Sequence, residues 1–136
     1  MVPARYMARI ADGVLAEALA VSGAVQVKGP KWCGKTATSL QQAASIVYLQ
    51  DPDRSVSYLA LADAKPSALL EGRTPRLIDE WQMAPQLWDA VRFAVDLRGE
   101  PGQFILTGSS TPTVGGAHSG VGRIAPMVMR TMTLFE

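Results

Sequence analysis

The sequence predicts an α/β fold in which a mostly parallel sheet carries helices on both faces, giving three layers. Short runs of β-branched and aromatic residues alternate along the chain with apolar patterns at helical spacing, as in βαβ units. The chain has 136 residues, of which 48% are hydrophobic and 18% are charged. This length and composition are typical of one soluble domain with its own core.

The first half of the chain begins with an amphipathic helix, which ends at Ser22-Gly23. We expect its buried face to consist of Ile10, Val14, Leu15, Ala18 and Leu19. The elements that follow are expected at 24–28 for a strand, 36–44 for a helix, 46–49 for a strand, and 55–70 for one or two short helices. Pro66 is expected to interrupt the last range.

The second half contains a third short strand at 77–79 and then a helix that starts well at Pro85, because proline suits the first helical turn. Gly99 is expected to end this helix. A fourth strand is expected at 104–106, and imperfect apolar alternation at 127–135 indicates a fifth. An uncharged loop rich in Gly, Ser and Thr lies between them at 108–122.

Charge, cysteine content and hydropathy exclude several classes of protein. Thirteen basic and twelve acidic residues give a net charge of +1, which argues against a nucleic-acid-binding or polybasic membrane module. The single cysteine leaves no pair for an internal disulfide and suits a reducing compartment. No apolar run is long enough to span a membrane, and residues 1–13 lack the apolar core of a signal peptide. We therefore expect a cytoplasmic domain.

The first strand runs into a segment that matches the pattern G-x-x-x-x-G-K-[ST]. Its residues are Gly29, Pro30, Lys31, Trp32, Cys33, Gly34, Lys35 and Thr36. The glycines let successive backbone N–H groups point at one anion, and the following helix adds the partial positive charge of its N-terminus. Lys35 can then reach the β- and γ-phosphates of a nucleotide, and the Thr36 hydroxyl can ligate Mg²⁺. The alternative is a glycine turn with a solvated lysine.

The third strand ends in two adjacent acidic residues, Asp79 and Glu80. Ligands bind beyond the carboxyl ends of strands in open parallel sheets, so both side chains are candidates for the same site as the glycine loop. Asp79 is expected to hold Mg²⁺ through water, and Glu80 to act on the attacking water. The alternative is a helix N-terminus with solvated acids.

The fourth strand ends in small hydroxyl residues, Thr107, Ser109 and Ser110. One of these hydroxyls could lie between the γ-phosphate and the attacking water. A simple strand-to-loop turn explains the segment equally well, because glycine and serine favour turns.

Together these motifs resemble the AAA+ branch of the P-loop ATPases, and more closely the prokaryotic AAA-domain proteins in which a C-terminal domain of unknown function follows the ATPase core. The resemblance covers nearly the whole chain. The segments that carry it are 29–36, 77–82, 87–92, 104–109, 118–123 and 129–136.

The resemblance implies an ASCE-type core, in which another strand separates the phosphate-loop strand from the acidic strand. It implies ATP and Mg²⁺ as cofactors, Walker A roles for Lys35 and Thr36, and Walker B roles for Asp79 and Glu80. It also implies a sensor role for residues 107–109, so that Thr107 joins the nucleotide-binding set and Ser109 the catalytic set. Arg123 is expected to act as a basic residue near a nucleotide, including a neighbouring subunit's.

Relatives of this kind continue past a segment such as 134–136 into a helical lid and a C-terminal domain. We therefore expect residues 1–136 to be a P-loop ATPase core that is truncated at its C-terminus and lacks the lid. Self-association or the missing C-terminal domain would then be its partners, besides ATP and ADP.

Some residues admit a plainer interpretation. Cys33 is more readily an inert small side chain than a reactive thiol, because no partner cysteine exists. His118 lies in the glycine loop, either as a loop residue or in contact with phosphate or water. Trp81 and Trp88 are expected to anchor the helix that follows the acidic strand. Three methionines are expected to form an apolar edge left bare by the missing C-terminal part, although they could also be core: Met127, Met129 and Met132.

The function predicted from these features is ATP binding and Mg²⁺-dependent ATP hydrolysis that drives a conformational change in a larger protein. The alternative is a nucleotide-binding switch or assembly module with negligible hydrolysis in this form. A small-molecule phosphotransferase is disfavoured, because Glu80 directly after Asp79 suits the activation of water.

Overall fold

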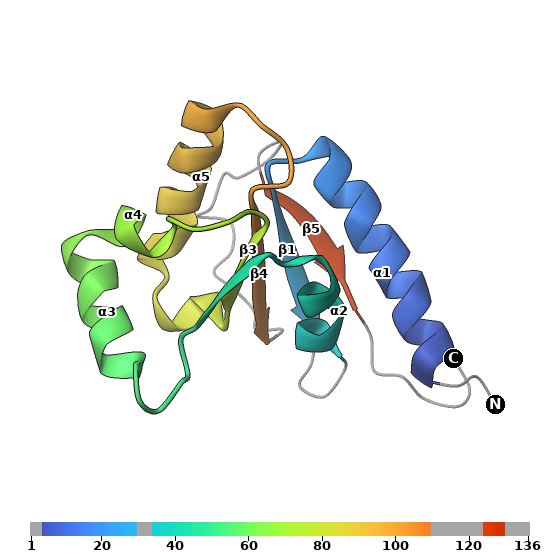
Figure 1. Ribbon diagram of the computed structural model, residues 1–136, viewed down its shortest axis with the longest axis horizontal. Helices are drawn as coiled ribbons and strands as arrows, with labels where there is room; N and C mark the ends of the chain where they lie inside the picture. The colour runs from blue at the N-terminus through green and yellow to red at the C-terminus, as the bar shows by residue number, and fades with distance from the viewer. Residues whose placement is uncertain (1–3, 30–33, 110–123, 130–136) are drawn as a thin grey trace.

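The computed structural model describes residues 4–29, 34–109 and 124–129 (Figure 1). The described residues form a sheet of five parallel strands in the order β2-β3-β4-β1-β5. The strands are β1 (Ala24–Gly29), β2 (Ser45–Tyr48), β3 (Arg76–Asp79), β4 (Phe104–Ser109) and β5 (Ile124–Val128). Because β4 lies between β1 and β3, the strand that leads into the glycine loop is separated from the acidic strand, as expected.

Helices cover both faces of this sheet, and the described part of the chain therefore has the expected three layers. The helices are α1 (Ala4–Val21), α2 (Lys35–Gln42), α3 (Ser55–Ala64), α4 (Pro66–Leu69) and α5 (Gln86–Arg98), with a 3-10 turn, η1 (Trp81–Met83). In Figure 1, α1 and α2 lie on one side of the strands, and α3, α4 and α5 on the other. The α/β fold with helices on both faces of a parallel sheet is confirmed.

Strict alternation along the strands divides the core into two clusters. On the α1 and α2 side, Leu15 and Leu19 pack against Val25, Leu77 and Ile105. The cluster on the other side includes Leu69, Leu87, Val91, Ile78 and Phe104. Successive strand residues thus face opposite layers. A polar residue at the end of a strand therefore lies on the same face of the sheet as the apolar residue two positions before it.

The helix boundaries agree with the turn residues of the sequence. Pro66 opens α4 directly after α3 has ended, and Pro85 precedes the first residue of α5. Gly99 follows α5 with φ +66°, a left-handed conformation that glycine adopts without a steric cost. No described helix has the combination of length and apolar character that a membrane crossing needs.

The buried face of α1 differs from the predicted one. Leu15 and Leu19 are buried, but Ile10 and Val14 are each 48% exposed. Ala18 packs against the core as predicted, and Ala11, which was not in the predicted face, does so too. The stripe that faces the sheet is therefore rotated toward the small residues, which allow a helix to approach its neighbours closely.

The fifth strand begins earlier than predicted and includes Pro126. Among the described strands β5 pairs only with β1, so its other edge has no ladder bond for a proline to remove. Met127 and Met129 are 7% and 8% exposed and belong to the core beneath α1, so the prediction of a bare methionine edge was wrong for both. Met132 and most of the predicted 108–122 loop lie outside the described residues.

Candidate active site

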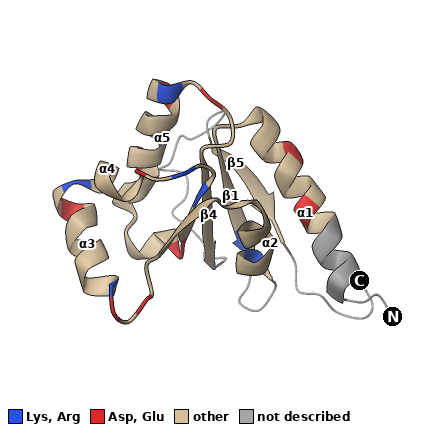
Figure 2. Cartoon of the chain, in the orientation of Figure 1, with Lys and Arg blue, Asp and Glu red and all other residues tan. Residues whose placement is uncertain are grey.

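The carboxyl ends of β1, β3 and β4 meet at one edge of the sheet. Asp79 of β3 pairs in register with Thr107 of β4, and Lys28 of β1 pairs with Gly108. Charged residues are scattered over several helices and loops of the described ribbon (Figure 2). The charge at this edge of the sheet therefore comes from the few ionised side chains that lie there.

Helix α2 begins beside this edge. Gly34 precedes it with φ +94° and ψ +13°, a conformation in which a side chain would be strained. Lys35 is the first helical residue and is only 6% exposed. Burial of an ammonium group is costly unless it is paired or hydrogen-bonded, so the lysine is held in place and does not extend into solvent.

The carboxylate of Asp79 joins three elements. Its Oδ1 atom accepts a hydrogen bond of 3.0 Å from the hydroxyl of Thr36 in α2 and one of 2.6 Å from the hydroxyl of Thr107 in β4. Leu77 and Ile105, two residues earlier in their strands, belong to the core cluster on the α1 and α2 side. Strand alternation therefore turns Asp79 and Thr107 toward the start of α2.

The structure shows which group Thr107 contacts. The sequence places Thr107 among the predicted nucleotide-binding residues. In the structure its side chain is fully buried and its hydroxyl donates to Asp79. Its observed partner is thus a carboxylate of the site.

Glu80 leaves β3 in an unusual backbone conformation. Its φ and ψ are +59° and +51°, and among the described residues no other non-glycine residue has a positive φ. The left-handed conformation costs an L-residue roughly 1–2 kcal/mol. It turns the chain into η1, where the amide N–H of Met83 donates to the carbonyl of Glu80 at 3.1 Å.

The turn after Glu80 is anchored by two tryptophans. Trp81 and Trp88 are 9% and 7% exposed, and their ring centroids lie 5.0 Å apart at an interplanar angle of 41°. Tilted aromatic pairs at this distance add to the stabilisation from burial alone. The predicted anchoring of the helix after the acidic strand is confirmed.

Sequence reasoning assigned no part to Gln82, although the residue lies within the quoted 77–82 segment. Its side-chain amide Nε2 donates a hydrogen bond of 2.6 Å to Oε1 of Glu80. The spacing of two residues was visible in the sequence. The contact, however, depends on the left-handed backbone at Glu80 and on the 3-10 turn, and no residue pattern indicates either of them.

Several predicted site residues lie where nothing further is described. Gly29 ends β1 and is buried, whereas Pro30, Lys31, Trp32 and Cys33 lie outside the described residues. The same holds for Arg123 and His118. Ser109 is the last residue of β4, and only its backbone is described.

The donor set suits a magnesium ion. In the described part of the chain no three His, Cys, Asp or Glu side chains lie together as a metal-binding group. Mg²⁺ does not need such a cage, because it commonly binds one or two protein oxygens and completes its shell with water and substrate phosphates. The Thr36 hydroxyl and the Asp79 carboxylate, 3.0 Å apart, supply oxygen atoms of that kind beside a phosphate-loop motif.

Residues 22–136 match the family model of the AAA domain, which covers the sheet, the glycine loop and both acidic residues. No match was found among curated proteins. The matched range begins directly after α1 and includes every predicted site residue. The chain thus belongs to the AAA domain family of P-loop ATPases.

Proposed function

We propose that this domain binds ATP with Mg²⁺ at the carboxyl ends of β1, β3 and β4 and hydrolyses it, and that the reaction drives a conformational change in a larger protein. The observation that supports this most strongly is the carboxylate of Asp79, which accepts hydrogen bonds from Thr36 and Thr107. These contacts connect the helix after the glycine loop with the two strands that end beside it.

The phosphates would be held by the backbone N–H groups of the loop from Gly29 to Gly34 and by the ammonium group of Lys35. The N-terminal end of α2 adds a partial positive charge. Thr36 and Asp79 would hold Mg²⁺, which supplies neutralisation of the phosphate charge. Thr107, through its hydrogen bond, would fix the orientation of the Asp79 carboxylate.

Glu80 would orient and deprotonate the attacking water. The water oxygen forms the new bond to the γ-phosphorus, the bond from that phosphorus to the bridging oxygen breaks, and ADP leaves with the bridging oxygen. The water proton passes to the Glu80 carboxylate. Ser109 and Arg123 remain proposed catalytic residues, Ser109 at the end of β4 and Arg123 near the nucleotide of this domain or of a neighbour.

Replacing Glu80 with Gln tests the assignment, because it removes the proton acceptor and keeps the size of the side chain. ATP hydrolysis should fall by about 10²–10⁴-fold, the usual contribution of a general base, while the affinity for Mg-ATP stays within a factor of about two. Asp63→Asn, at an exposed carboxylate of α3, is the matched control and should leave the rate unchanged. Equal rates for Glu80→Gln and the wild type would show that Glu80 is not the base.

The switch hypothesis gives a different pattern in the same experiment. A wild-type domain that binds Mg-ATP tightly but hydrolyses it no faster than a protein-free blank would act as a nucleotide-binding module, whereas equal rates well above that blank would only exclude Glu80 as the base. The proposed ATPase requires a clear difference between the two proteins.

A further inference from the structure

Gln82 contacts the proposed catalytic base directly. Its Nε2 atom donates to Oε1 of Glu80 at 2.6 Å. A carboxylate can only accept hydrogen bonds, so the amide nitrogen must face Glu80 and the amide oxygen must face away from it. This hydrogen bond restrains a glutamate side chain that otherwise has three rotatable bonds.

The other end of the amide lies against Gly108 in β4. A Cβ atom added at Gly108 would clash with Oε1 of Gln82, and would lie 3.1 Å from Cδ of Gln82 and 3.3 Å from Cδ1 of Trp81. The same oxygen is buried and has no hydrogen-bond partner among the described groups. The Gln82 amide therefore occupies the space that a side chain at position 108 would fill. The hydrogen bond to Glu80 restrains one end of the amide, and the backbone at Gly108 restrains the other.

We propose that Gln82 is a positioning residue for Glu80, and that Gly108 is required because it leaves room for the Gln82 amide. The proposal rests on the proposed function, since it assigns Gln82 to the residue that would activate water. Contact with Gly108 fixes the amide, and the amide fixes one oxygen of the carboxylate. The second carboxylate oxygen is then left to receive the water proton.

The first test compares Gln82→Ala with the wild type. A misplacement of about 1 Å in a reacting group can cost 10²-fold in rate, so we expect kcat for ATP hydrolysis to fall by about 10–100-fold. The affinity for Mg-ATP should stay within a factor of about two, because the side-chain hydrogen bond of Gln82 in the described structure goes to Glu80 and not to the proposed magnesium ligand Asp79. Gln86→Ala is the matched control: that glutamine donates a bond of 2.7 Å to Asp63, away from Glu80, and its loss should leave kcat unchanged.

Gly108→Ala provides an independent test. The added methyl would overlap only with the end of the flexible Gln82 side chain, and the ring of Trp81 at 3.3 Å would need to move by a few tenths of an ångström. The protein should therefore fold, and the Gln82 amide should be displaced. Hydrolysis should fall as in Gln82→Ala. In the Gln82→Ala background the same substitution should cause less than a twofold further loss, because the amide that it displaces is absent. Gly13→Ala, where nothing lies within 4 Å of the added methyl, is the control.

The contact itself can be followed without any turnover. The side-chain NH₂ resonances of Gln82 in a ¹⁵N–¹H spectrum should shift in Glu80→Ala and in Gly108→Ala, and should not shift in Gln86→Ala. Unchanged resonances in Glu80→Ala would overturn the proposal.

The kinetic results also distinguish a failure of the role proposed for Gln82 from a failure of the proposed ATPase function. If Glu80→Gln slows hydrolysis but Gln82→Ala does not, or if Gln82→Ala speeds it, the positioning role is refuted and the proposed function stands. If Glu80→Gln has no effect, the proposed function fails, and the role of Gln82 fails with it.

Discussion

Replacing Thr107 with Val tests the polar centre of the site, because valine keeps the shape of the side chain and removes its hydroxyl. The hydroxyl is fully buried and donates a 2.6 Å hydrogen bond to the Asp79 carboxylate. Loss of a hydrogen bond to a charged group costs about 1.5–3 kcal/mol of stability. With an unfolding entropy of about 2.1 cal/mol/K per residue, this loss lowers Tm by about 5–10 °C for a chain of 136 residues.

The same substitution should change the magnesium dependence of ATP binding. Asp79 would keep Thr36 as a donor and lose the donor from β4. Removal of a group that orients a metal ligand commonly lowers metal affinity by 10–100-fold. The Mg²⁺ concentration for half-maximal ATP binding should therefore rise by at least about tenfold, measured by calorimetric titration at fixed ATP.

Thr107→Ser is the matched control, because it keeps the hydroxyl and loses only a methyl group. Its stability should fall by about 1 kcal/mol through the lost burial, and its magnesium dependence should stay at the wild-type value. A Thr107→Val protein with wild-type Tm and wild-type magnesium dependence would refute the role given to this hydrogen bond.

Three further predictions address the fold and the metal site. Trp88→Ala should lower the free energy of unfolding by about 3–5 kcal/mol in urea denaturation, whereas Phe93→Ala, at a 68% exposed position of the same helix, should change it by less than about 0.5 kcal/mol. Similar losses in the two variants would contradict the burial of Trp88 in the core. Gly99→Ala should lower the free energy of unfolding by about 1 kcal/mol because of the φ of +66° at Gly99, while Gly13→Ala within α1 should raise it by about 0.5–1 kcal/mol. A change of the same sign in both variants would argue against the backbone conformations assigned to these glycines. Thr36→Ala should weaken Mg-ATP binding by about 10–100-fold and Thr36→Ser should preserve it, so equal calorimetric affinities for the two variants would exclude a role for the hydroxyl.

The arrangement of the site was predictable because its residues lie at the ends of apolar runs that can be recognised as strands in the sequence. Asp79 and Thr107 each end a short apolar run, and parallel strands bring such ends to one edge. Strand alternation then directs both side chains to the face on which α2 begins. Periodicity and the motif spacing are therefore enough to predict which residues meet at this edge.

Other features depend on tertiary contacts that the pattern does not encode. Ile10 and Val14 are as apolar as Leu15, and periodicity alone does not say which of two adjacent stripes of a helix faces a sheet. Pro126 argues against a strand until the pairing of β5 with β1 alone in the described sheet is known. The Gln82–Glu80 hydrogen bond was not predictable either, because it requires a left-handed residue that is not glycine.

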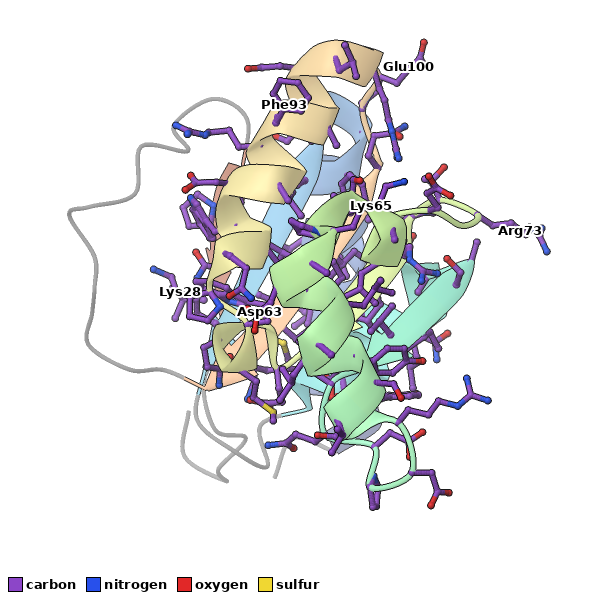
Figure 3. The ribbon with its side chains drawn as sticks, turned by 90° about the vertical axis from the view of Figure 1, so that its left-hand side faces the viewer. Lys28, Asp63, Lys65, Arg73, Phe93 and Glu100 are labelled. Carbon is purple, nitrogen blue, oxygen red and sulfur yellow. The ribbon has the colours of Figure 1, made fainter. Side chains whose placement is uncertain are left out.

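The most direct test of nucleotide binding at this edge is a calorimetric titration of Mg-ATP into the wild type, Lys35→Ala and Lys65→Ala. Lys35 begins α2 beside the strand ends, whereas Lys65, labelled in Figure 3, lies at the α3–α4 junction, on the other side of the sheet from α2 (Figure 1). We expect saturable binding by the wild type and by Lys65→Ala, and a loss of at least about tenfold in affinity for Lys35→Ala, because a charge-assisted hydrogen bond contributes about 1.5–3 kcal/mol. Equal affinities for the three folded proteins would contradict the placement of the phosphates at the glycine loop.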